Sequence, residues 1–114
     1  ARLQRSGSGL HIARRGAQPL GFILIDPHGV AGAPYIASIA CAAEARGQGV
    51  GSALLDYAES LYPQSRYIFL CVSSFNGGAR RLYERRGYAL VGVLKDYVID
   101  GADEDLMAKR LVTR

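Results

Sequence analysis

The sequence lacks the features that define membrane, disulfide-stabilised and metal-binding proteins. None of its uninterrupted apolar runs approaches the roughly 18 residues of a membrane-spanning helix. Its two cysteines, Cys41 and Cys71, lie in apolar runs and form no C-x-x-C pair, so we expect buried, unreactive thiols. His11 and His28 have no second ligand at metal spacing, and we expect both to face solvent and no metal to be bound. With no apolar signal segment at the start, the expected location is the reducing cytoplasm.

Features of a nucleic-acid-binding domain are also missing, although the chain is basic. Fourteen Lys and Arg residues against ten Asp and Glu residues give a net charge of +4, mostly from Arg, which suits an anionic partner. However, the sequence has no Arg-rich helix face with interleaved aromatics, no RNP-like strand and no zinc spacing. The charge therefore favours an anionic partner, and the sequence does not favour DNA or RNA as that partner.

The chain has enough length and apolar material for one globular domain. A chain of 114 residues can hide roughly two-thirds of the surface that its unfolded form exposes. Residues 1–9 have no hydrophobic period and end in Ser and Gly, so we expect a flexible lead-in, followed by a single domain over residues 10–114.

Hydrophobic periodicity predicts an α/β domain with a mixed sheet. The expected strands are 10–14, 20–26, 35–42, 67–72, 88–99 and 105–111, and the expected helices are 50–61 and 77–86. On the first helix, Val50, Ala53, Leu54, Tyr57, Ala58 and Leu61 form one apolar stripe. Because helices join the third strand to the fourth and the fourth to the fifth, the sheet should contain a parallel pair.

The glycine-rich loop before the first helix is the strongest candidate for a binding site. Residues 46–52 read Arg-Gly-Gln-Gly-Val-Gly-Ser, between an apolar strand and a helix N-terminus. Glycines let a ligand approach the backbone, and the first-turn N–H groups and the helix dipole favour phosphate. The loop has no Gly-Lys-Ser/Thr and does not match the dinucleotide spacing Gly-x-Gly-x-x-Gly. A glycine-rich turn without a ligand is the alternative interpretation.

With this loop and a second motif in residues 76–88, the sequence resembles the GNAT superfamily of N-acetyltransferases. Residues 46–51 are similar to its Q/R-x-x-G-x-G/A signature, and residues 76–88, Asn-Gly-Gly-Ala-Arg-Arg-Leu-Tyr-Glu-Arg-Arg-Gly-Tyr, are similar to its N-x-x-A-x-x-L-Y-E-K-x-G-F signature. The resemblance extends over about residues 20–111 and implies a GNAT-like, mostly antiparallel sheet whose central parallel strands splay apart. It also implies that acetyl-coenzyme A is the co-substrate and an amine is the acceptor.

The resemblance assigns roles to particular residues. Those expected to bind acetyl-coenzyme A are Ile39, Ala40, Cys41, Arg46, Gly47, Gln48, Gly49, Val50, Gly51, Ser52, Asn76 and Tyr83. A backbone N–H of residues 39–41 would stabilise the oxyanion, and Tyr83 would protonate the leaving thiolate. Simple core packing remains the alternative for Tyr83, and helix capping remains the alternative for Asn76.

Two departures from the family pattern bear on the acceptor. Residues 35–41 contain no carboxylate, and Glu44 belongs to the turn, so we assign no general base and expect a proton path through water. The opening strand and two helices that wall the acceptor cleft in relatives have no counterpart before Leu10. This chain is then a compact version, a fragment, or one whose wall comes from another chain, as in a homodimer. We predict an N-acetyltransferase; the alternative is a non-catalytic acyl-coenzyme A-binding or regulatory module.

Overall fold

The computed structural model describes residues 2–5 and 9–111, with side chains from residue 9 onward except those of residues 98 and 99. In these ranges the chain forms seven strands, one 3-10 helix and two α-helices. They are β1 (Arg2–Arg5), β2 (Leu10–Arg15), β3 (Gln18–Val30), β4 (Ala33–Cys41), η1 (Ala43–Ala45), α1 (Val50–Ser60), β5 (Tyr67–Ser73), α2 (Gly77–Arg85), β6 (Ala89–Ile99) and β7 (Ala102–Arg110). All the strands belong to one sheet, in the order β1-β2-β3-β4-β5-β7-β6.

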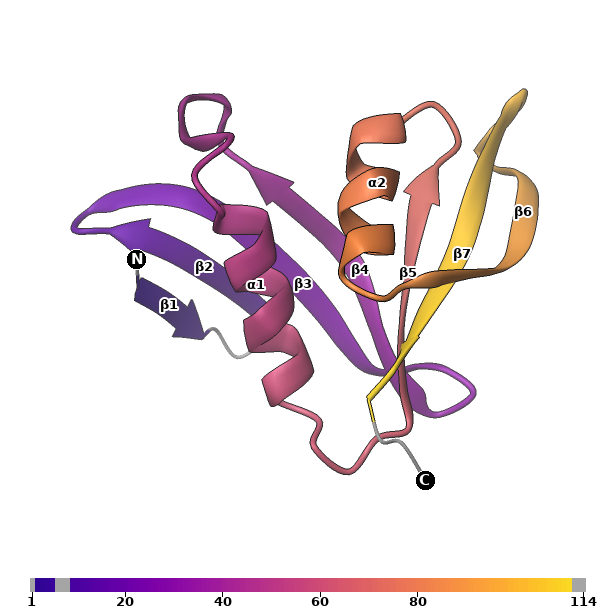
Figure 1. Cartoon of the computed structure of the whole chain (residues 1–114), viewed down its shortest axis with the longest axis horizontal. Helices are drawn as coiled ribbons and strands as arrows, with labels where there is room; N and C mark the ends of the chain where they lie inside the picture. The colour runs from indigo at the N-terminus through magenta and orange to yellow at the C-terminus, as the bar shows by residue number, and fades with distance from the viewer. Residues whose placement is uncertain (1, 6–8, 112–114) are drawn as a thin grey trace.

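The sheet is mixed, as the sequence predicted. Only β4 and β5 pair in parallel among the described strands, and the other neighbours are antiparallel. The parallel pair arises because α1 connects β4 to β5 and carries the chain back to the same end of the sheet. β4 and β5 begin side by side and separate toward their C-terminal ends (Figure 1).

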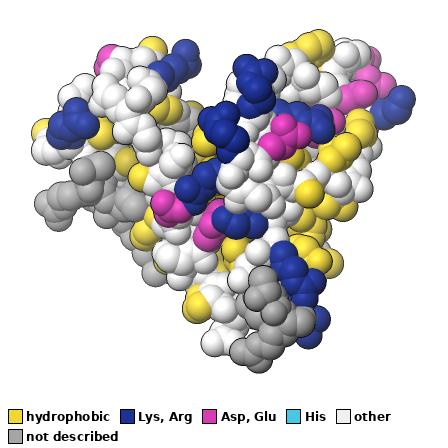
Figure 2. Space-filling view, viewed as in Figure 1, with side chains coloured by type: hydrophobic (Ala, Val, Ile, Leu, Met, Phe, Trp, Pro, Cys, Tyr) yellow, Lys and Arg dark blue, Asp and Glu magenta, His cyan; other side chains and the backbone are white. Residues whose placement is uncertain are grey.

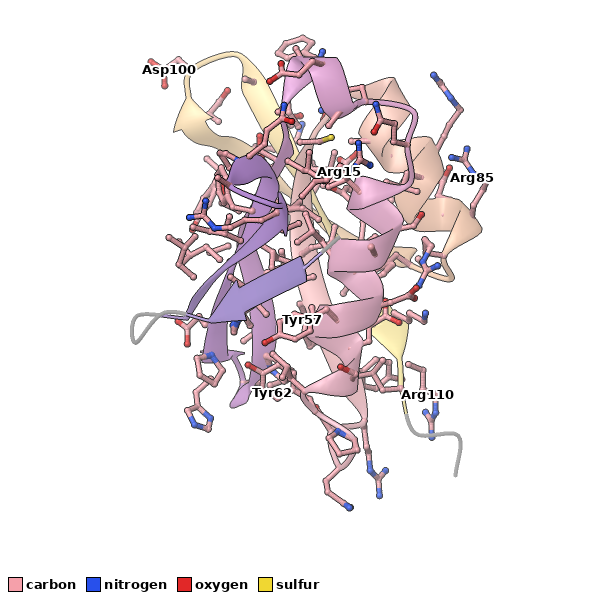
Figure 3. All side chains as sticks on the ribbon, turned by 90° about the vertical axis from the view of Figure 1, so that its left-hand side faces the viewer. Arg15, Tyr57, Tyr62, Arg85, Asp100 and Arg110 are labelled. Carbon is pink, nitrogen blue, oxygen red and sulfur yellow. The ribbon has the colours of Figure 1, made fainter. Side chains whose placement is uncertain are left out.

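Both α-helices cover the same face of the sheet (Figures 1 and 3). Val50, Leu54 and Ala58 of α1 are buried against the strands, and Leu61 packs against the same core while partly buried, so these four positions of the predicted apolar stripe are confirmed. Ala53 was also predicted to lie on this stripe, but it is exposed, whereas Leu55 is completely buried. The buried face of α1 is thus rotated toward Leu55. We call the helix-covered side of the sheet the helix face and the other side the open face.

Strand boundaries differ from the sequence prediction at the front of the chain. Residues 2–5 were expected to be part of an irregular lead-in, but their backbone forms β1, paired antiparallel with β2. The remaining lead-in positions 1 and 6–8 lie outside the described residues. β3 continues to Val30, through a segment predicted as loop, because its irregular register after Asp26 still returns to a pair with Ala33.

The prediction that His11 faces solvent is wrong. Its side chain is 3% exposed, and its ring meets that of Tyr57 in α1 edge-on, at 4.9 Å between centroids. The Tyr57 hydroxyl lies 3.1 Å from His11 Nδ1. Period-2 alternation explains this position, because His11 and the buried Ala13 lie on the same face of β2, which α1 covers. His28 is exposed, as predicted.

In the described ranges, neither α-helix is both long and apolar enough to span a membrane.

Candidate functional site

The loop between η1 and α1 holds two glycines in a left-handed conformation that other residues rarely adopt. Gly47 has a φ of 78°, and Gly49, the N-cap residue of α1, has a φ of 79°. Apart from chain neighbours, no heavy atom lies within 4 Å of the place where a Cβ would stand at either glycine. The first-turn N–H groups of α1 have no intrahelical acceptor, and no side chain caps them. This open, positively polarised end suits a phosphate or pyrophosphate.

Gly51 has a structural explanation as well. A Cβ at this position would stand 3.2 Å from Cδ2 of Leu82 in α2, closer than most real Cβ contacts. The absence of a side chain therefore lets α1 and α2 approach each other. The sequence prediction placed Gly51 beside a ligand; the structure also places it against Leu82, where a side chain would crowd the two helices.

The side chain of Gln48 connects the loop to two neighbouring segments. Its amide nitrogen donates to the carbonyl oxygen of Glu44 at 3.2 Å, and its amide oxygen accepts from Arg15 Nη2 at 3.3 Å. Arg15 ends β2 and lies beside the loop in Figure 3. The side chain of Gln48 thus holds the loop in shape, and the backbone of the loop is the part left to meet an anion.

A gap opens between β4 and β5 where their pairing stops. The two strands pair only through Tyr35 with Phe69 and Ile36 with Leu70, although both strands continue beyond these residues. On its other side, β4 skips one residue against β3, because Ile36 pairs with Ile25 whereas Ser38 pairs with Leu24. The residue left over is Ala37, and such a bulge bends and twists its strand. The splayed pair predicted from the resemblance is confirmed.

Two cavities occupy the gap and its mouth. One, of about 200 Å³, is lined by residues of β4 and β5 and by Asn76, Ala79 and Tyr83. The other, of about 640 Å³, is lined by Ile39, Ala40, Cys41, Arg46, Asn76 and Ala79. Three of these residues line both, so the cavities adjoin. The surface is notched between the loop before α1 and helix α2 (Figure 2). The structure thus brings together strand, loop and α2 residues that the sequence assigned to one site.

Tyr83 lies on α2 and lines the smaller cavity. Its side chain is 6% exposed, and its ring contacts that of Tyr88 edge-on, at 6.1 Å between centroids. Burial raises the pKa of the Tyr83 hydroxyl above its ordinary value, so the group stays protonated at neutral pH. Tyr83 therefore packs in the core and also lines the cavity. Its protonated hydroxyl can donate a hydrogen bond there.

Asn76 places α2 beside the gap. Its Oδ1 accepts from the N–H of Ala79 at 3.0 Å, which is the predicted helix cap, and Asn76 also lines both cavities.

Farther along α2, Arg80 forms an ion pair with Asp105 of β7, which is 5% exposed and also accepts from Ser74. Asp105 was not predicted from the sequence. Asp105 and Met107 are buried on β7 with the half-buried Leu106 between them, so strand alternation could have placed Asp105 on the buried face. Alternation could not have identified Arg80 as its partner.

Tyr35 and Cys71 form a second pair of polar groups at the gap. Burial raises the pKa of Tyr35 well above its ordinary value, and a hydrogen bond with Cys71 adds to this effect. Burial also raises the pKa of the Cys71 thiol. Both cysteines are free and only half-buried, so the prediction of buried thiols was wrong in degree. Sequence analysis did not single out Tyr35, because its partner lies on a distant strand.

Comparisons with known proteins agree with this geometry. The model of the Acetyltransferase (GNAT) family matches residues 1–88. An uncharacterized N-acetyltransferase of Methanocaldococcus jannaschii is 42% identical over 79 residues, which are 67% of this chain and 51% of that protein. The chain therefore belongs to the GNAT acetyltransferase family, and it spans about half the length of this curated relative.

Solved structures show the same fold at lower identity. Ard1 from Thermoplasma volcanium superposes with a TM-score of 0.83 at 24% identity, over 92% of this chain and 72% of that one. An aminoglycoside 6'-N-acetyltransferase, crystallised with coenzyme A, gives a TM-score of 0.79 at 19% identity, over 92% of this chain and 73% of that one. These likenesses establish the fold, which is the predicted GNAT-like mixed sheet.

Proposed function

We propose that this chain transfers an acetyl group from acetyl-coenzyme A to a primary amine by direct attack. The observation that carries the proposal is the convergence of Arg46, Asn76 and the end of β4 on one cavity, beside a glycine loop open to anions. Family membership supports it, as does the coenzyme A bound to the aminoglycoside acetyltransferase of the same fold.

Different residues at the gap would bind the pyrophosphate, the pantetheine arm and the acetyl carbonyl of acetyl-coenzyme A. The N–H groups of residues 47–52 and the Arg46 guanidinium would hold the pyrophosphate. β4 has no β5 partner after Ile36, so main-chain groups of Ile39, Ala40 and Cys41 on that side are free for the pantetheine arm and the carbonyl oxygen. Asn76 would contact the same arm from α2.

The proposed transfer forms one bond and breaks one. The amine nitrogen, deprotonated through water, attacks the carbonyl carbon while a β4 N–H stabilises the oxygen that gains charge. When the tetrahedral intermediate collapses, the C–S bond breaks, and Tyr83 donates its proton to the departing thiolate. The nitrogen of the intermediate gives up its extra proton to water, and the tyrosinate recovers a proton from that water, so the proton lost by nitrogen balances the one gained by sulfur. Glu44, in η1, remains outside this scheme.

Calorimetric titration with acetyl-coenzyme A tests the binding step. We expect wild-type protein to bind, and Gly49→Glu to bind at least about tenfold more weakly, because it places a like charge against the pyrophosphate. Arg46→Gln offers a variant without backbone strain, and Gln64→Glu adds the same charge at an exposed position outside the site. Absence of binding to wild type would contradict the proposal.

Turnover separates the enzyme from the alternative of a non-catalytic acyl-coenzyme A-binding or regulatory module. Release of coenzyme A thiol is followed with phenethylamine, spermidine, kanamycin and a short peptide with a free N-terminus. We expect amine-dependent release with at least one acceptor class. Tight binding of acetyl-coenzyme A without release across the whole panel would favour the binding module.

A further inference from the structure

We propose that Glu104 of β7 binds the ammonium group of the amine acceptor on the open face of the sheet. This inference rests on the proposed function, because it assigns a residue to the acceptor side of the same gap. The side chains of β5 and β7 beside the gap point alternately to the helix face and to the open face.

Strand alternation divides β5 between the two faces. Ile68, Leu70 and Val72 are buried on the helix face, so Cys71 and Ser73 point to the open face. Both of these residues also line the smaller cavity. The gap between β4 and β5 can therefore be reached from the open face at Cys71 and Ser73, as well as from the helix face at Tyr83.

The register of β7 places Glu104 beside these residues. Ser73 pairs with Glu104, and Cys71 pairs with Leu106. The next residue, Asp105, points toward α2, where it pairs with Arg80, so Glu104 must point to the open face. In Figure 3 the tip of the β6–β7 hairpin, marked by Asp100, lies on the side of the sheet away from α1.

The electrostatic environment of the gap supports the same placement. The negative charge of Glu104 contributes, after burial, to raising the pKa of Tyr35 and of Cys71, so the carboxylate acts on both groups. Glu104 is half-buried. Among the residues that the structure describes, the carboxylates in ion pairs are Glu84, Asp105, Asp56 and Glu59. Within the described ranges no Lys or Arg forms an ion pair with Glu104, which lies opposite Ser73 at the edge of the cavity.

An unpaired carboxylate at this position has a chemical use. A primary amine with a pKa near about 10.4 is an ammonium ion at neutral pH. The ammonium can pair with Glu104 while its chain rests on the aromatic residues of the open face, such as Tyr35 and Phe69. Acceptor and acetyl-coenzyme A then reach the gap from opposite faces, and the class of acceptor is a cationic primary amine with an apolar stem.

Backbone NMR of the protein without acetyl-coenzyme A tests this proposal independently of turnover. Phenethylamine is the probe, and 2-phenylethanol is its uncharged counterpart. We expect phenethylamine to shift the amides of Cys71, Ser73 and Glu104, and its Kd to rise about fivefold or more in Glu104→Gln. Asp100→Asn removes the same charge from the exposed hairpin tip and should change the Kd less than about twofold.

Three results would overturn the assignment: no shifts at these amides, an unchanged Kd in Glu104→Gln, or an equal effect of Asp100→Asn. In a second arm, Glu104→Gln should raise the KM for phenethylamine while leaving the Kd for acetyl-coenzyme A unchanged. Failure of acetyl-coenzyme A to bind wild type would contradict the proposed function alone, because the amine titration does not depend on it.

Discussion

At the scale of single residues, Tyr83 combines burial with access to the cavity at the gap. Its side chain is 6% exposed and lines the smaller cavity together with Asn76 and Ala79. Burial raises its pKa, which keeps the proton on the hydroxyl until a strong base, such as a departing thiolate, is formed nearby. The same burial explains why periodicity alone identified Tyr83 only as a core residue.

Tyr83→Phe should lower turnover without affecting binding of acetyl-coenzyme A. We expect kcat to fall about 100-fold, the usual size of a lost general acid, because the phenyl ring fills the same space but carries no proton. The Kd for acetyl-coenzyme A should stay within about twofold. Tyr88→Phe is the matched control, since Tyr88 is also buried but does not line the cavity. An unchanged kcat in Tyr83→Phe would remove this residue from the mechanism.

At the scale of elements, an asymmetric ion pair between Arg80 and Asp105 joins helix α2 to strand β7, in addition to the packing of Tyr83 in the core. The Asp105 side chain is 6% exposed, whereas that of Arg80 is 34% exposed and also reaches Glu84. A buried carboxylate that loses its cation keeps a desolvation cost, while a partly exposed guanidinium can turn to water. Loss of Arg80 and loss of Asp105 should therefore lower the free energy of unfolding by different amounts.

Arg80→Gln should destabilise the fold more than Asp105→Asn. We expect a loss of about 2 kcal/mol for Arg80→Gln, below the roughly 3–5 kcal/mol of a broken, fully buried pair because Arg80 is partly exposed, and a smaller loss for Asp105→Asn. Urea unfolding followed by circular dichroism measures both. Glu84→Gln, which removes only the surface pair within α2, should cost less than about 0.5 kcal/mol. Equal losses for the first two variants would contradict the argument.

At the scale of the whole molecule, two buried tyrosines, Tyr83 and Tyr88, and the half-buried Tyr35 couple stability to alkaline pH. Burial is the largest cause of the raised pKa of Tyr35, Tyr83 and Tyr88, and the Glu59 charge adds to it at Tyr88. In the unfolded chain these groups release their protons near about pH 10, whereas in the folded chain they retain them. Their contribution is therefore complete below that pH and is lost as the pH rises above it.

The free energy of unfolding should fall steeply above about pH 10. Each tyrosine that ionises only on unfolding adds a slope of about 1.4 kcal/mol per pH unit. Urea midpoints at pH 8, 10 and 11 measure this. Tyr88→Phe should reduce the slope by about one group, because it removes one tyrosine whose pKa is raised in the folded state. A flat profile to pH 11 would mean that these tyrosines ionise in the folded state.

The sequence by itself determined the order of most elements, the parallel strand pair and the glycine loop. These features depend on the local hydrophobic period, on turn residues and on the lengths of connections, all of which are set by residues close together in the sequence. It also grouped the loop with residues 76–88 through resemblance to a family. It misplaced His11 because nothing in the strand shows which face a distant helix will cover.

Only the tertiary structure decided which residues meet across the sheet. The bulge at Ala37, the short pairing of β4 with β5, and the register of β7 against β5 place Tyr35, Cys71 and Glu104 at one gap. These residues lie up to about 70 positions apart, and their pairing follows from strand register, which local sequence does not encode. Gly51 was likewise explained only when Leu82 of α2 was seen against it.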